Sequence, residues 1–173
     1  MSAWRIALRG KGGLETPAAI PHLKPMARRI VILNGPNLNL LGRREPAVYG
    51  RATLGDIETA CREEASRLGM EVECWQSNSE GELVTWIQEI PGRFAGVVLN
   101  AGAYSHTSIA LLDALRALDE PLIEVHLSNI YRRETFRQHS YVSLAATGVI
   151  CGFGPEGYVM ALRALAAMWD DAQ

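Results

Sequence analysis

The chain has 173 residues, of which 48% are apolar, and a formal net charge of −2. A chain of this length and composition is expected to fold as one compact domain that buries roughly 70% of its unfolded surface. The charge gives no basic excess for general nucleic-acid binding. No apolar run reaches the roughly 18 residues that span a bilayer, and the N-terminus lacks the apolar core of a signal peptide. We therefore expect a cytoplasmic protein with neither a nucleic acid nor a membrane as partner.

The spacing of cysteines and histidines argues against a disulfide framework or a metal centre. The three cysteines are Cys61, Cys74 and Cys151, an odd number that forms neither a CxxC pair nor a Cys/His ligand spacing. The four histidines show no HExxH or similar pairing. We expect reduced cysteines in the core and no bound metal.

The first segment of the chain differs from the rest. Residues 1–25 are rich in Gly, Pro and basic residues and show no steady apolar period, whereas Met26 is soon followed by a compact apolar run. We divide the chain into an N-terminal extension, residues 1–28, and a single α/β domain, residues 29–173. Two explanations of the extension stay open: a disordered segment, and an upstream start codon with Met26 as the functional start.

Beyond the extension, apolar strands alternate with amphipathic helices. Five strands are expected near residues 30–34, 70–75, 95–99, 122–127 and 147–151, with four helical stretches between them and a last helix near 155–169. The expected N-caps are Thr53 for the first helix, Ser79 for the second, and Ser105 or Thr107 for the third. Gly69 is expected to end the first helix.

Strands that alternate with helices pair in parallel through right-handed crossovers, which gives a doubly wound sheet with helices on both faces. Five strands favour a flavodoxin-like, five-stranded parallel sheet with the order 2-1-3-4-5. Ligands of such sheets bind beyond the carboxyl ends of the strands, where the winding reverses. We therefore expect a site among the loops that follow Leu33, Leu99 and Leu127.

The loop after the first strand, residues 34–50, is far longer than the usual connection of about two to six residues. Such length is typical of a lid or a binding loop. Asn37 and Asn39 supply amides, and Arg44 lies five residues before Tyr49. The alternative is turn chemistry with solvated arginines.

The loop after the third strand combines an amide, Asn100, with an imidazole, His106, shortly before a helix N-terminus. That position favours anionic ligands, because the first N–H groups of a helix have no partner within it. The pair therefore suits recognition of a hydroxyl or carboxylate group. The alternative is that Asn100 and the neighbouring hydroxyls of Ser105 and Thr107 only cap the helix.

The end of the fourth strand carries a carboxylate and an imidazole. Period-two alternation places Glu124, His126 and Ser128 on one face. The carboxylate can orient the imidazole and raise its basicity, which suits proton transfer near neutral pH. The alternative is a buried pair with a structural role. Just beyond, Arg133 and Arg137 are four residues apart and are expected to share one face of a helical turn.

Other patterns narrow the chemistry. Residues 152–157 match GxGxxG, but only one helix follows, so the next strand and the acidic residue of a dinucleotide site are missing and we interpret the glycines as a tight turn. No GxSxG elbow marks a hydrolase. The only lysines, Lys11 and Lys24, lie in the extension, so the domain has no amine for a Schiff base. Tyr, His, Arg and Asn remain, a set suited to proton transfer and enolate stabilisation.

Taken together, the three loops resemble the type II 3-dehydroquinate dehydratases. The resemblance covers Arg29 to Met168 and rests on the segments 34–50, 99–108 and 124–143. It implies a lyase that reversibly converts 3-dehydroquinate to 3-dehydroshikimate, in the shikimate pathway or in quinate breakdown. It implies no metal or organic cofactor, and it makes residues 29–173 a single catalytic domain.

At the matching positions, Tyr49 resembles the base that removes the proton beside the ketone, and Arg44 the cation that makes its phenolate accessible. Asn37 matches the residue that holds a water against the enolate oxygen. His126 matches the acid that protonates the departing hydroxyl, and Glu124 would orient it.

The remaining matches hold the substrate or join subunits. Substrate-holding positions are matched by Asn100, His106, Ser128, Arg133 and Arg137, and the backbone amides of Leu127 and Ser128 match those that receive the carboxylate. Asp113 matches a position that reaches a neighbouring subunit's site, which implies a homododecamer built as a tetramer of trimers. Two other functions stay open: a flavodoxin-like module that binds FMN or a phosphoryl group, and a structural domain whose polar loops contact other subunits.

Overall fold

A computed structural model describes residues 27–43 and 51–170 of the chain. Its centre is a five-stranded, all-parallel sheet with the order β2-β1-β3-β4-β5, as predicted. The strands are β1 (Arg28–Asn34), β2 (Met70–Gln76), β3 (Gly96–Asn100), β4 (Leu122–His126) and β5 (Gly148–Cys151). The winding reverses between β1 and β3, whose last residues, Asn34 and Asn100, are paired in register.

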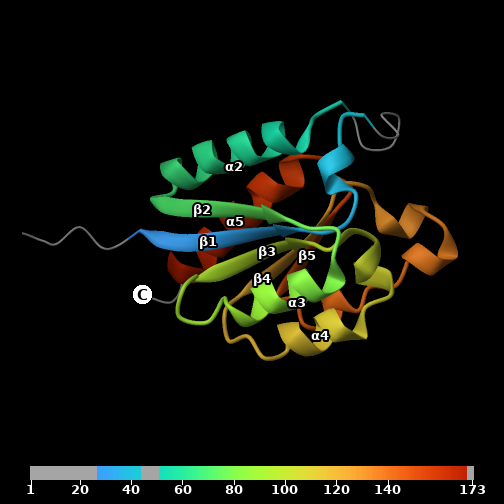
Figure 1. The fold of residues 1–173 in the computed structure, drawn as a ribbon. Helices are drawn as coiled ribbons and strands as arrows, with labels where there is room; N and C mark the ends of the chain where they lie inside the picture. The colour runs from blue at the N-terminus through green and yellow to red at the C-terminus, as the bar shows by residue number, and fades with distance from the viewer. Residues whose placement is uncertain (1–26, 44–50, 171–173) are drawn as a thin grey trace, which may run out of the picture.

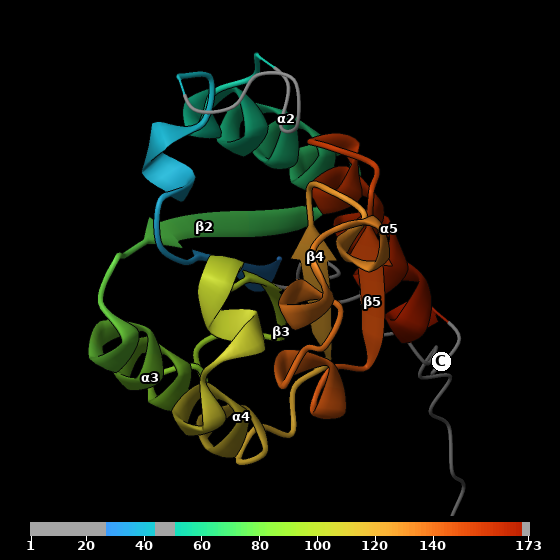
Figure 2. The same ribbon diagram turned by 90° about the vertical axis from the view of Figure 1, so that its right-hand side faces the viewer.

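Two pairs of helices cover the two faces of the sheet (Figure 1 and Figure 2). They are α2 (Leu54–Arg67) and α5 (Glu156–Asp170) on one face, and α3 (Glu80–Gln88) and α4 (Ile109–Leu115) on the other. Each pair covers its own core, because the side chains of a strand point alternately to the two faces. Ile30 and Ile32 of β1 pack in the core under α2 and α5, whereas Val31 and Leu33 pack in the core under α3 and α4.

The connection between β4 and β5 corrects one expectation. In place of a fourth helical stretch it holds three short 3-10 turns, η3 (Ile130–Arg132), η4 (Thr135–Arg137) and η5 (Val142–Leu144). Arg133 has an extended backbone between η3 and η4, so it does not share a helical face with Arg137. The segment is rich in charged and polar residues and lacks the apolar spacing that would pack a helix against the sheet.

Three of the four predicted helix ends are confirmed. Thr53 is the N-cap of α2, Ser79 is the N-cap of α3, and Gly69 follows the end of α2. The third N-cap was predicted wrongly. It is Ser108, whose hydroxyl accepts the Leu111 N–H at 2.9 Å, and neither Ser105 nor Thr107. The chain first forms a 3-10 helix, η2 (Gly102–His106), which delays the start of α4.

The glycine-rich segment after β5 is a tight turn, as expected. Gly152 and Gly154 have φ angles of +91° and +58°, in the region that favours glycine. Their N–H groups donate to the carbonyls of His126 and Leu127 at 3.1 and 2.9 Å. The turn therefore braces the end of β4, where the predicted imidazole lies.

The three cysteines are free: Cys61 lies in the core, and Cys74 and Cys151 are half-buried. Burial raises the pKa of the thiols of Cys61 and Cys74 to about 12, so both stay protonated at neutral pH. Within residues 27–43 and 51–170, no helix is long and apolar enough to cross a membrane. The same ranges contain no group of three or more His, Cys, Asp or Glu side chains placed to hold a metal ion.

Candidate active site

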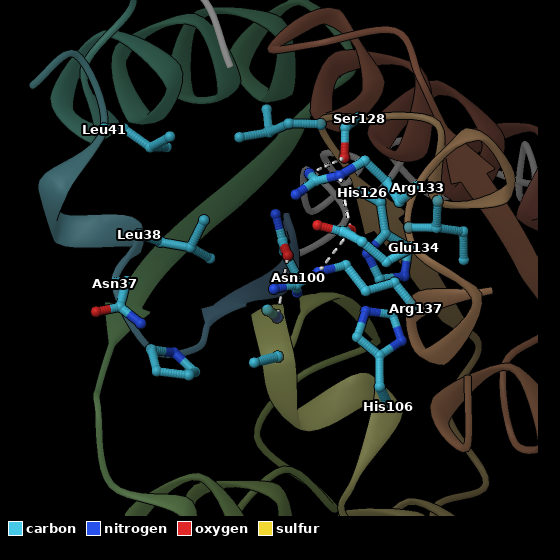
Figure 3. A pocket seen from close by; sticks show the side chains of 15 residues that line it. Asn37, Leu38, Leu41, Asn100, His106, His126, Ser128, Arg133, Glu134 and Arg137 are labelled. Atoms are coloured by element: carbon cyan, nitrogen blue, oxygen red, sulfur yellow. Dashed lines mark hydrogen bonds and ion pairs between the residues drawn. The ribbon is translucent and has the colours of Figure 1, made fainter. Parts of the chain in front are cut away.

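A cavity of about 180 Å³ opens beyond the carboxyl ends of β1, β3 and β4 (Figure 3). It is lined by Pro36, Asn37, Leu38, Leu41, Asn100, Gly102, Ala103, His106, His126, Leu127, Ser128, Ile130, Arg133, Glu134 and Arg137. These residues come from the three loops that the sequence singled out. The cavity therefore lies where a doubly wound sheet binds its ligand.

Close packing of two loops builds one wall of the cavity. The Gly35 N–H donates to the Asn100 carbonyl at 2.8 Å, so the chain after β1 lies directly on the chain after β3. A Cβ atom on Gly35 would lie 2.4 Å from the carbonyl oxygen of Ala101. Only glycine allows this approach, because the obstructing atoms belong to the backbone and cannot rotate away.

We expect Gly35→Ala to lower the free energy of unfolding by about 1–3 kcal/mol, the usual cost of forcing an extra methyl into a packed region. Urea denaturation with the slope held in common would measure it. Gly81→Ala is the matched control, because a Cβ atom on Gly81 would meet nothing within 4 Å. An unchanged midpoint for Gly35→Ala would show that the two loops can separate at no cost.

Asn37 sits at the turn that leads from β1 into the long loop. It is the one non-glycine residue with positive φ among those described, at +66°, a conformation that asparagine tolerates better than most residues. Its N–H donates to Asn78 Oδ1 at 2.9 Å. The following 3-10 turn, η1 (Leu38–Leu40), places Leu38 in the apolar wall beside the Asn37 amide.

Glu124 and His126 form a buried pair at the end of β4. His126 Nε2 lies 2.7 Å from Glu124 Oε1, and Glu124 also accepts hydrogen bonds from Ser140 and Ser143, each at 2.5 Å. Burial alone would raise the pKa of Glu124, but the His126 ring and the two hydroxyls outweigh it and hold that pKa below its usual value. Because the carboxylate accepts from Nε2, Nδ1 is the ring nitrogen left for a ligand.

The depressed pKa of Glu124 has a defined effect on stability. A carboxyl that is more acidic in the folded protein stabilises it above the unfolded pKa, near 4.5, and loses that contribution as the pH falls through the lower folded value. We expect Glu124→Gln to be less stable than the parent chain by about 1–3 kcal/mol at pH 7, with the difference shrinking below about pH 4.5. Urea denaturation across this pH range would measure it. A difference that does not change with pH would contradict an ionised Glu124.

His106 faces His126 across the cavity. The two rings are stacked with centroids 6.0 Å apart and an interplanar angle of 13°. His106 Nδ1 lies 2.7 Å from the His139 carbonyl, which can only accept, so Nδ1 carries the proton. Burial, together with the charges of His126 and Arg137, lowers the pKa of His106 despite that hydrogen bond. A neutral His106 therefore leaves Nε2 as an acceptor for a ligand hydroxyl.

The third side of the cavity is cationic. Arg133 and Arg137 both line it, and each contacts Glu134 Oε2 through Nε, at 3.4 and 3.2 Å (dashed in Figure 3). Arg133 also donates to the Ser128 hydroxyl at 3.4 Å. The pKa of Glu134 is lowered by its own backbone N–H and by the two guanidinium groups. The guanidinium groups of Arg133 and Arg137 at this side suit an anionic or hydroxyl-rich ligand.

Most of the predicted site residues meet in this cavity, namely Asn37, Asn100, His106, His126, Leu127, Ser128, Arg133 and Arg137. Glu124 stands behind His126, as predicted. Asp113 is exposed on α4 and does not line the cavity. Arg44 and Tyr49 lie outside the described residues. Glu134 also lines the cavity and was not predicted, although its position between Arg133 and Arg137 in the sequence could have indicated it.

Comparisons with known proteins identify the family of this chain. The family model described as dehydroquinase class II matches residues 28–166. The chain is also 57% identical over 143 residues, covering 83% of it and 91% of its relative, to a 3-dehydroquinate dehydratase of Brucella canis. The chain belongs to the class II dehydroquinase family.

Solved structures of type II dehydroquinases share the fold of this family member. The enzyme from Propionibacterium acnes is 47% identical with a TM-score of 0.79, and the match covers 82% of this chain and 98% of that one. The enzyme from Butyrivibrio crossotus is 41% identical with the same TM-score of 0.79, over 80% and 97% of the two chains. The flavodoxin-like sheet is therefore that of the class II dehydroquinases.

Proposed function

We propose that this class II dehydroquinase removes water from 3-dehydroquinate through an enolate, with Tyr49 as the base and His126 as the acid. The enzyme class, a 3-dehydroquinate dehydratase, rests on the family. The observation that supports the assignment of the acid is the Glu124–His126 pair, which ends inside the cavity with one ring nitrogen left over. The two open alternatives, an FMN or phosphoryl module and a structural domain, have no comparable support.

The reaction needs two proton transfers. In the first, the Tyr49 phenolate takes a proton from the carbon beside the ketone, and the electron pair of that C–H bond forms the enolate. In the second, the enolate collapses to the enone as the C–O bond breaks, and protonated His126 gives its proton to the leaving hydroxyl. Water departs, and proton exchange with solvent restores both groups. No oxidant, metal or amine enters this balance.

Tyr49 is assigned from the family resemblance. A phenol is a weak acid, so the neighbouring guanidinium of Arg44 is proposed to favour its ionised form. Leu41 lines the cavity, and only Gly42 and Arg43 separate it from Arg44 in the sequence. The chain thus enters the segment that carries Arg44 and Tyr49 from the edge of the site.

The remaining contacts are proposed to hold the ring. Asn37 supports a water that stabilises the enolate oxygen, where charge develops only during the reaction. The backbone amides of Leu127 and Ser128 receive the carboxylate. The hydroxyl groups of the ring bind to Asn100, His106, Arg133 and Arg137, all of which line the cavity.

The test of this function is absorbance by the conjugated enone when the purified protein is mixed with 3-dehydroquinate. We expect turnover that a chelator does not change. Borohydride added together with substrate should leave the mass of the protein unchanged, because no imine forms. Absence of turnover would reject the function, and a covalent adduct after reduction would reject the enolate route.

We also propose that the chain assembles as a homododecamer, a tetramer of trimers, in which Asp113 reaches a neighbouring subunit's site. Asp113 is exposed on α4, one helical turn beyond Ile109, an apolar side chain that is 57% exposed. Light scattering coupled to size exclusion would measure the mass. A monomer at assay concentrations would reject the assembly.

A further inference from the structure

A buried tyrosine connects the two strands at which the winding of the sheet reverses. Tyr158 of α5 is fully buried, and its hydroxyl lies 2.9 Å from Asn100 Nδ2 and 2.7 Å from Asn34 Oδ1. Asn34 ends β1 and Asn100 ends β3. The phenol oxygen therefore bridges two neighbouring strand ends from beneath the cavity.

The direction of these hydrogen bonds is fixed. The Asn100 amide nitrogen can only donate, so the phenol oxygen accepts from it, and the phenol proton is then donated to Asn34 Oδ1. Burial raises the pKa of Tyr158, so the phenol keeps this proton throughout the working range. Asn34 Nδ2 has no hydrogen-bond partner in the described part of the chain, so the bond from Tyr158 orients this amide.

Asn100 is consequently held from two sides. Its Nδ2 donates to Tyr158, and its Oδ1 accepts the Gly102 N–H at 3.2 Å. A flipped amide would place its NH2 group against the Gly102 N–H, two donors face to face. One N–H and one oxygen lone pair stay unused in these bonds, and Figure 3 shows the Asn100 side chain at the cavity between Leu38 and the arginine side.

We infer that Tyr158 is a positioning residue for substrate binding, which fixes the amide of Asn100 so that its remaining N–H and lone pair are presented to a ring hydroxyl. Tyr158 does not line the cavity, and of its two hydrogen-bond partners only Asn100 does, so Tyr158 acts on the substrate through Asn100. The inference rests on the proposed role of Asn100 in holding the substrate. It adds a residue of α5, which none of the three loops contains, to the machinery of the site.

The test compares Tyr158→Phe, Asn100→Ala and the double variant in steady-state kinetics with 3-dehydroquinate. A phenylalanine keeps the ring in the core and removes only the hydroxyl. We expect Tyr158→Phe to raise KM roughly threefold to tenfold, the effect of one hydrogen bond, with kcat within about twofold of the parent. With Asn100→Ala already present, Tyr158→Phe should raise KM no further.

Val159→Ala is the matched control for stability, because Val159 is a neighbouring buried residue of the same helix and bonds to neither asparagine. We expect it to lower the melting temperature and leave KM unchanged. A normal KM for Tyr158→Phe, together with a raised KM for Asn100→Ala, would overturn the inference and leave the role of Asn100 intact. A normal KM for Asn100→Ala would overturn both. Additive effects in the double variant would show that Tyr158 acts by some route other than Asn100.

Discussion

Replacing His126 with alanine is expected to lower kcat by roughly 100-fold to 10,000-fold, the usual contribution of a positioned general acid. Its ring is held by Glu124 at 2.7 Å and lines the cavity. The second imidazole there, His106, uses its Nδ1 proton in the bond to the His139 carbonyl and has a lowered pKa, so it is a poor substitute as the acid. The variant should be less stable but still fold, because Glu124 keeps its hydrogen bonds from Ser140 and Ser143. The enone assay under saturating substrate would measure kcat.

His139→Ala is the matched control for this experiment. The His139 ring is exposed and packs against Tyr141, and it does not line the cavity. The contact of His139 with His106 is made by its backbone carbonyl, which the substitution keeps. We expect near-normal kcat for this variant. If His126→Ala changed only KM, His126 would be a binding residue and the acid would have to be sought elsewhere.

Tyr49→Phe is expected to lose a similar factor, roughly 100-fold to 10,000-fold in kcat, because phenylalanine cannot accept a proton. A second measurement uses 3-dehydroquinate with deuterium at the carbon beside the ketone and follows exchange of that deuterium with solvent. If Tyr49 is the base, the variant should lose exchange of that position with solvent in parallel with turnover. Arg44→Ala should show the same pattern, since the phenolate would then lack its cation.

The control for Tyr49 is Tyr131→Phe. Tyr131 is 61% exposed in η3 and is not among the residues that line the cavity. This variant should keep both turnover and exchange. Retention of kcat by Tyr49→Phe, in a protein that remains folded, would show that another group removes the proton.

Much of the fold could be predicted from local patterns. Short apolar runs separated by amphipathic stretches predicted the parallel sheet and its order, and the structure confirms both. Period-two alternation in one strand predicted that Glu124 and His126 would meet, and they do. These predictions succeeded because each depends on residues that are close in the sequence or on the chirality of crossovers.

The features that the sequence did not predict depend on contacts between distant segments. The β4–β5 connection was expected to be helical, but Ser140 and Ser143 hold it to the buried Glu124 as a series of short turns. The Asn34–Tyr158–Asn100 chain joins three separate elements, and periodicity marks Tyr158 only as one more core residue. Such polar contacts inside a core become visible only once the elements are packed.

The most direct test of the account is a crystal structure of the enzyme with the product, 3-dehydroshikimate. We predict that the ring occupies the cavity between Asn100 and Arg137, with the His126 imidazole facing the position of the departed hydroxyl and the Tyr49 oxygen within hydrogen-bond distance of the carbon that lost its proton or of the water bound there. A complex in which the Tyr49 oxygen lies far from the ring in every subunit, or in which the product binds away from His126, would contradict the proposed chemistry.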